Sequence, residues 1–200
     1  MHIEVDDLSR PQVHALLEEH LANMYELSPP EQVFALDLNQ LRADDITFWT
    51  VWQEGLLLGC GALKELTPAH GEIKSMRTPA AARGRGAGRS VLAHIILVAQ
   101  QRGYTKLSLE TGTHPAFEPA HKLYRSQGFA MSGPFGGYLA NEHSVFMELG
   151  LSGILAKAPA QEQSQGQAPS PSLAAPKMSH KQPQSVHKDG MHLPHSGRRL

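Results

Sequence analysis

The chain has 200 residues, with 18 Lys and Arg against 19 Asp and Glu, so its formal net charge is −1. Residues 1–155 hold 12 of the basic and 17 of the acidic residues, and this negative balance argues against nucleic-acid binding through bulk charge. No apolar run approaches the roughly 20 residues that a membrane span needs. A single cysteine, Cys60, excludes an internal disulfide, and we expect a reduced, cytoplasmic setting for a chain whose acidic N-terminus lacks a signal-peptide core.

The first forty residues predict one strand and two helices. His2–Val5 alternates as a short strand. Ser9 is the predicted N-cap of a helix, with Gln12 three residues on as its capping-box partner. That helix ends before the Ser-Pro-Pro run at 28–30, because proline cannot continue a helix. A shorter helix is predicted over Leu36–Leu41.

Three strands are predicted next. Thr47–Gln53 and Leu56–Leu66 are joined by a tight Glu-Gly turn and form an antiparallel hairpin. Gly59 and Gly61 lie inside the second of these strands, which predicts a bulge or a close backbone neighbour there. A further strand is predicted over residues 70–78.

A glycine-rich turn follows that strand and leads into a strong helix. The helix is predicted from about Gly86, with apolar residues near the 3.6-residue period, and Gly103 ends it. The start of a helix carries unpaired N–H groups and a partial positive charge, so it forms a ready anion site. Glycines let the backbone approach an anion, and Arg83, Arg85 and Arg89 add phosphate-binding groups.

The second half predicts a strand at Lys106–Glu110, a helix at Phe117–Gln127, and strands at Phe129–Met131 and Ser144–Leu149. The element order β-α-α-β-β-β-α-β-α-β-β indicates an α/β (α+β) fold, a mixed sheet with helices on both faces. From about residue 156 the chain is rich in Gln, Pro, Ser, Ala, Lys and His, so we expect a disordered tail at 156–200 after a domain at 1–151. The spacing of the histidines in this tail matches no standard metal-ligand pattern, and we expect no metal.

The glycine-rich turn fits neither common phosphate motif. A Walker loop would need glycine at 83 and lysine at 89, and both positions are arginine. The dinucleotide fingerprint would need glycine at 89 or 91. What remains is Arg83-x-x-Gly86-x-Gly88, placed behind a strand and opening a helix.

A second motif accompanies the first. Residues 120–129, AHKLYRSQGF, match the pattern A-x-x-L-Y-x-x-x-G-F, 34 residues after Gly86 and beyond an intervening strand. Together the two motifs resemble the GNAT N-acetyltransferases, whose acetyl-CoA signature is Q/R-x-x-G-x-G/A. The resemblance covers residues 1–150 and points to a small bacterial subgroup whose acceptor is unassigned. One departure is Phe117, which stands where many members have an asparagine that contacts the pantetheine arm.

The resemblance implies a mostly antiparallel central sheet and acetyl-CoA as co-substrate, with no metal. It implies that Met76 offers its backbone N–H to the thioester oxygen and that Thr78 pairs with a pantetheine amide. The remaining implied donor-site residues hold the pyrophosphate region or flank it: Arg77, Arg83, Gly84, Arg85, Gly86, Ala87, Gly88, Arg89 and Ser90.

The resemblance also implies the chemistry. Glu72, eleven residues before Arg83, matches the strand glutamate that acts as general base in several members, with Glu110 or a water relay as alternatives. Tyr124 matches the general acid near the sulfur. The expected reaction moves an acetyl group to a primary amine of a small molecule or peptide by direct attack in a ternary complex. The alternative is a non-catalytic acyl-CoA-binding module.

The acceptor site is implied less sharply. It is expected to involve the first helix and its following loop, the hairpin, the strand gap and the late loop. No nucleic-acid or membrane partner is expected, and pairing into a homodimer is considered by analogy. The candidate acceptor residues are Tyr25, Glu31, Phe48, Glu110, Phe135 and Tyr138.

Overall fold

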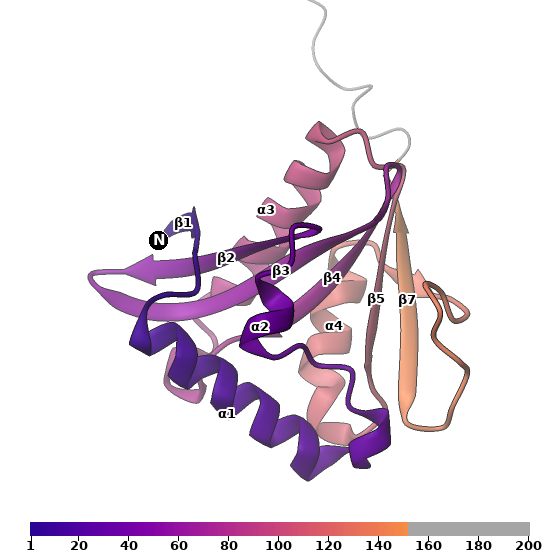
Figure 1. The fold of residues 1–200 in the computed structure, drawn as a ribbon, viewed down its shortest axis with the longest axis horizontal. Coiled ribbons are helices and arrows are strands. Elements are labelled where there is room, and N and C mark those ends of the chain that lie inside the picture. The colour runs from indigo at the N-terminus through magenta and orange to yellow at the C-terminus, as the bar shows by residue number, and fades with distance from the viewer. Residues whose placement is uncertain (152–200) are drawn as a thin grey trace, which may run out of the picture. The chain divides into compact units, whose positions relative to one another are not determined.

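The computed structural model describes residues 1–151, which form one sheet covered by helices on both faces (Figure 1). The strands are β1 (His2–Val5), β2 (Ile46–Gln53), β3 (Leu56–Thr67), β4 (His70–Arg77), β5 (Lys106–Gly112), β6 (Ala130–Met131) and β7 (Ser144–Gly150). The helices are α1 (Pro11–Leu27), α2 (Leu38–Leu41), α3 (Ala87–Gln101) and α4 (Glu118–Ser126), with 3-10 turns at Pro30–Gln32, Ala80–Ala82 and Pro115–Phe117. The predicted tail lies outside the described residues.

The sheet has seven strands in the order β1-β2-β3-β4-β5-β7-β6. Every neighbouring pair is antiparallel except β4 with β5, which run parallel because α3 connects them. The predicted order of elements and the predicted fold class are therefore confirmed. No helix within residues 1–151 is long and apolar enough to cross a membrane.

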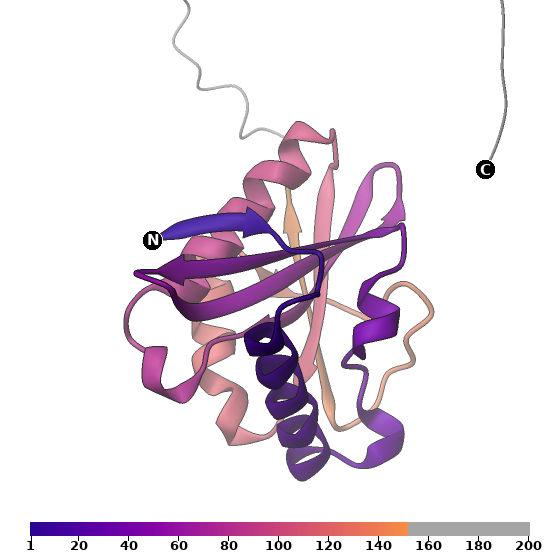
Figure 2. The same cartoon turned by 60° about the vertical axis from the view of Figure 1, so that its left-hand side comes forward.

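Each face of the sheet buries its own apolar cluster. Helices α1 and α2 lie on one face and α3 and α4 on the other, as the two views show (Figures 1 and 2). On the α3 face, Leu92 and Ile95 are buried with Leu107 of β5. On the α1 face, Leu16 is buried with Phe48 of β2. Each such side chain contributes about 1.5–3 kcal/mol by leaving water, so the two clusters fix both helix layers against the sheet.

The start of α1 differs from the prediction. Arg10 is the N-cap, no side chain caps the helix, and Pro11 occupies its first turn. The backbone N–H of Ser9 instead donates to the carboxylate of Asp7 at 2.9 Å. Proline lacks the N–H that a cap would satisfy and already has a helical φ, so the helix starts two residues after Ser9 without the predicted capping box. A capping box is present at α2, between Asp37 and Gln40.

Candidate active site

The parallel strands β4 and β5 part near the middle of the sheet. Their pairing runs from His70 with Lys106 to Ile73 with Leu109 and stops there, although both strands continue for several residues. On its other side β4 keeps its pairing with β3. The gap therefore opens directly beyond Ile73.

A bulge in β4 lies beside this gap. Ala62 of β3 pairs with Lys74 and Cys60 pairs with Arg77, so Gly61 faces two residues of β4 instead of one. One of the two bulged residues, Ser75, has a φ of 51°, a left-handed conformation that is uncommon outside glycine. The bulge turns the backbone of β4 at the point where acyl-transfer chemistry was expected.

Two glycines of β3 allow this close packing. A Cβ on Gly59 would lie 2.8 Å from the carbonyl oxygen of Arg77, and a Cβ on Gly61 would lie 2.6 Å from the sulfur of Met76. Both predicted features of these glycines are therefore confirmed. The partner strand β4 has a bulge opposite Gly61, and its backbone lies close to Gly59.

The start of α3 has the features of an anion site. Gly86 is its N-cap with a φ of 85°, and no side chain of the described residues caps its first N–H groups. Arg83, Arg85 and Arg89 are exposed and make no ion pair within residues 1–151. Uncapped N–H groups next to unpaired guanidinium groups suit a diphosphate chemically.

The side chain of Arg77 takes another direction. Its Nη2 donates to Glu19 Oε1 at 2.6 Å and also to Asn23, so the guanidinium is tied to α1. Burial and the charge of Arg77 lower the pKa of His20, on the same helix, to about 4. Arg77, one of the predicted donor-site residues, thus has a side chain that is already engaged by α1.

Glu72 lies in a buried polar cluster with Lys74 and Tyr138. Its carboxylate pairs with the Lys74 ammonium at 3.2 Å and accepts a hydrogen bond from the Tyr138 hydroxyl at 2.6 Å. Lys74 also donates to Tyr138 at 2.7 Å and to the carbonyl oxygen of Phe34 at 3.0 Å. The side chains of Glu72 and Lys74 are 4% and 8% exposed, so this is a buried ion pair.

The other predicted carboxylate, Glu110, is the first residue of β5 beyond the pairing with β4. It accepts a hydrogen bond from Ser144 at 2.7 Å. Burial raises its pKa, and the charge of Glu72 acts in the same direction, while Ser144 and Lys74 oppose the shift. Glu110 therefore stands at the gap as a carboxylate that binds a proton more readily than usual.

Tyr124 of α4 is buried near Glu110. Burial raises the pKa of its phenol, and the charge of Glu110 adds to the effect, so the two groups lie within electrostatic reach of each other. The ring packs against Phe129 with centroids 5.9 Å apart. The predicted general acid is thus a protonated phenol buried in the apolar cluster of the α3 face.

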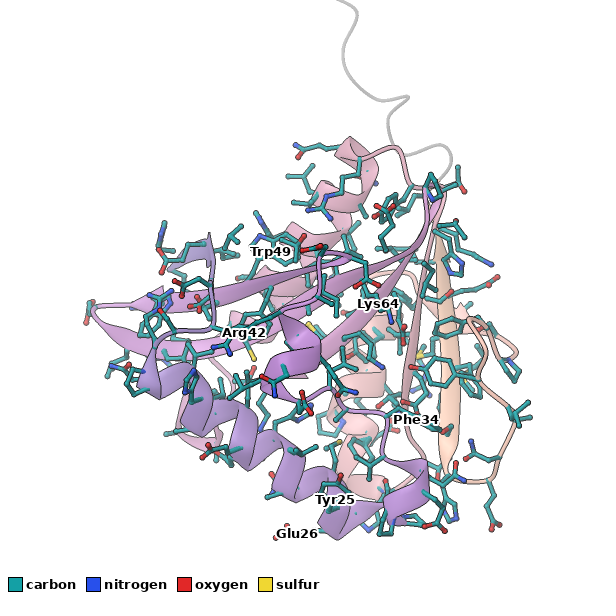
Figure 3. All side chains as sticks on the ribbon, viewed as in Figure 1. Tyr25, Glu26, Phe34, Arg42, Trp49 and Lys64 are labelled. Atoms are coloured by element: carbon teal, nitrogen blue, oxygen red, sulfur yellow. The ribbon has the colours of Figure 1, made fainter. Side chains whose placement is uncertain are left out.

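A cavity of about 300 Å³ lies over Glu72 and Lys74. Tyr138 lines it, and the Phe135 ring packs against the Tyr138 ring with centroids 5.1 Å apart. Figure 3 views the sheet from the side of α1 and α2, with Lys64 of β3 and Phe34 of the α1–α2 connection labelled on this side. The cavity is lined by Val33, Phe34, Ala35, Leu36, Gln40, Lys64, Leu66, Glu72, Lys74, Gly136 and Tyr138.

Three predicted acceptor residues lie elsewhere. Phe48 is buried in the apolar cluster under α1 and does not line the cavity over Glu72. Tyr25 is 53% exposed at the end of α1, beside Glu26, which lines a second cavity of about 390 Å³ (Figure 3). Glu31 is exposed in a 3-10 turn after α1. The predictions missed Lys74 and Lys64, although Lys74 is two residues after Glu72 on a strand and so shares its face.

The geometry defines a class of fold: a mixed sheet in which two parallel strands part beside a bulge and lead to a glycine-lined helix start. Residues 13–129 match the sequence profile of the Acetyltransferase (GNAT) family. The chain belongs to this family.

Similar proteins agree with this assignment. The uncharacterized N-acetyltransferase YsnE of Bacillus subtilis is 54% identical over 147 residues, which span 74% of this chain and 97% of the relative. The uncharacterized N-acetyltransferase YedL of Escherichia coli is 47% identical over 149 residues, which span 74% and 94%.

Solved structures share the fold. One assigned to an acyl-CoA N-acyltransferase of Klebsiella pneumoniae superposes with a TM-score of 0.64 at 28% identity, covering 75% of this chain and 97% of that chain. A GNAT family acetyltransferase of Elizabethkingia anophelis, solved with acetyl-CoA bound, superposes with a TM-score of 0.52 at 17% identity, covering 74% and 97%. No group of His, Cys, Asp or Glu side chains in residues 1–151 is placed to hold a metal ion.

Proposed function

We propose that the chain transfers the acetyl group of acetyl-CoA to a primary amine by direct attack in a ternary complex. The observation that carries this proposal is the gap between β4 and β5, flanked by Glu72, Glu110 and Tyr124 and continuous in sequence with the uncapped start of α3. Acetyl-CoA supplies an activated thioester. The acceptor is the amine of a small molecule or peptide.

The donor site is assigned to the strand end and the helix start. Residues 83–90 hold the pyrophosphate with backbone N–H groups and arginine side chains. Met76 and Thr78, at and after the bulge, align the pantetheine arm through the main chain. The left-handed Gly86 supports this assignment, because a helix start with φ of 85° at its N-cap exposes its N–H groups without a side chain in front of them.

The base is assigned to Glu110 in preference to Glu72. The carboxylate of Glu72 is already engaged by the Lys74 ammonium and by a hydrogen bond from the Tyr138 hydroxyl. Glu110 has a raised pKa and one hydrogen-bond donor, Ser144. A base works best when its pKa lies near the working pH, so burial prepares Glu110 for the proton. Glu72 then attracts the amine and orients it.

The proposed reaction forms an amide bond and breaks the acetyl thioester. The neutral amine nitrogen attacks the thioester carbonyl carbon, the C–N bond forms and the C–S bond breaks. One amine proton passes to Glu110, and the CoA thiolate takes the phenolic proton of Tyr124, which solvent then replaces. The products are an N-acetylated amine and free CoA. The raised pKa of Tyr124 keeps that proton in place until the thiolate forms.

The test combines calorimetric binding of acetyl-CoA with release of the CoA thiol across a panel of amines. We expect Glu110→Gln to lower kcat/KM about 10²–10⁴-fold and Tyr124→Phe to lower kcat, both with an unchanged Kd for acetyl-CoA. Glu148→Gln, at an exposed position of β7, is the matched control and should behave as wild type. Absence of acetyl-CoA binding would refute the proposal. Tight binding without turnover of any amine would favour the non-catalytic module.

A further inference from the structure

The floor of the cavity over Glu72 carries more positive than negative charge. Lys64 of β3 lies directly opposite Glu72 in the antiparallel register, so the two side chains share one face of the sheet. Lys74 lies on the same face, two residues along β4. All three side chains line the cavity. Two lysines therefore flank one carboxylate.

The two lysines differ in what they already bind. Lys74 is 8% exposed and uses its three N–H groups on Glu72, Tyr138 and the Phe34 carbonyl. Lys64 has a single ionic contact in the described residues, with Asp45 at 3.8 Å, and its side chain is 35% exposed. Exposed pairs of this kind contribute little to stability, so an anionic ligand can displace Asp45 at little cost. Lys64 is the cation of this cavity that is available to a ligand.

The apolar walls of the cavity strengthen the interaction of Lys64 with an anionic ligand. Val33, Phe34, Leu36 and Leu66 surround the charged floor with apolar surface. An ion pair formed between such walls is screened less than one in bulk water. The cavity volume of about 300 Å³ lies at the lower end of the range for small-molecule sites, so it suits a ligand of amino-acid size better than a folded partner.

We propose that the acceptor is an amine that also carries a carboxylate, and that Lys64 selects it by binding that carboxylate while Glu72 attracts the amine. The inference rests on the proposed acetyl transfer and names the substrate class for the same site. Residues directly opposite on paired strands have Cβ atoms roughly 4.5–5.5 Å apart, so the Lys64 and Glu72 side chains can reach the two ends of one small ligand. The charges of the floor also set the orientation of the acceptor. Its amine lies at β4, beside the gap, and its carboxylate lies over β3.

The experiment measures CoA thiol release with matched acceptors: free amino acids, their decarboxylated amines and their amides, starting with leucine and phenylalanine and extending to the other amino acids. We expect wild type to prefer at least one amino acid over its amine and its amide by about tenfold or more in kcat/KM. Lys64→Gln should abolish this preference by raising KM for the amino acid. Lys106→Gln is the matched control, because Lys106 is a strand lysine with a similar ion pair, 3.6 Å to Glu148, and does not line the cavity.

Each result of this experiment either supports the carboxylate inference or overturns it. Decarboxylated amines that react as well as amino acids, or a preference that survives Lys64→Gln, would overturn the carboxylate inference while leaving acetyl transfer intact. Acetyl-CoA binding without turnover of any amino acid would also overturn it. A protein that neither binds acetyl-CoA nor releases thiol with any acceptor would instead refute the proposed function, which the calorimetric measurement distinguishes.

Discussion

Because Glu72 and Lys74 form a buried ion pair, we expect that removing one of the two charges strongly lowers the free energy of unfolding. Lys74→Met removes the ammonium 3.2 Å from the Glu72 carboxylate and leaves a charge that is 4% exposed with Tyr138 as its hydrogen-bond donor. Removing one partner of a buried pair costs roughly 3–5 kcal/mol. For a domain of this size that loss lowers Tm by roughly 6–20 °C.

The decisive measurement is a double-mutant cycle, in which the urea unfolding of each variant is monitored by circular dichroism. Glu72→Gln combined with Lys74→Met leaves no uncompensated charge, so the double variant should recover most of the free energy of unfolding that either single variant loses. Lys106→Met, which removes an exposed pair, should stay within about 0.5 kcal/mol of wild type. If the two single losses simply add in the double variant, the pair is not coupled and the role given to its burial is wrong.

Two further predictions concern the packing of β3 and the pH dependence of α1. Gly59→Ala places a Cβ 2.8 Å from the backbone oxygen of Arg77. We therefore expect the free energy of unfolding in urea to fall by about 1–3 kcal/mol and acetyl-CoA binding to weaken. Gly150→Ala is the control and should change neither, because a Cβ there has nothing within 4 Å. His20 has a pKa of about 4 in the folded protein against an ordinary value near 6.5, so its neutral form contributes stability above pH 6.5 that is lost as the pH falls toward 4. His20→Asn should flatten the urea midpoint between pH 7 and pH 4.5, and a profile as steep as that of wild type would contradict this reasoning.

The fold could be predicted because local signals mark nearly every element. The Glu-Gly turn before Leu56 and the glycines of β3 located the hairpin and its crowded partner strand. The error at the start of α1 shows how such signals compete: a good capping residue, Ser9, is followed by Pro11, which begins a helix without a cap. Where two local rules compete, the sequence alone does not show which one the tertiary structure satisfies.

The site could be predicted only as far as its motif extends. Glu72 and residues 83–90 belong to one strand, turn and helix, and the resemblance to the family assigned them to one site. The partners of Lys74 come from far along the chain: Phe34 is 40 residues away and Tyr138 is 64. A contact that depends on how two loops fold over a strand leaves no periodic trace in the sequence, and this is why the contacts of Lys74 with Phe34 and Tyr138 were missed.

The arrangement of charges gives the two carboxylates different tasks. In the proposed reaction Glu72, which faces two lysines and a tyrosine hydroxyl, orients the neutral amine and balances the charge of the cavity floor. Glu110, just beyond the pairing of β4 with β5, has burial as the main influence on its pKa and is the better proton acceptor. Environments that separate two neighbouring acids in this way assign one to binding and the other to proton transfer. In the proposed complex Lys64 binds only the far end of the acceptor, because β3 lies on the side of β4 away from the gap.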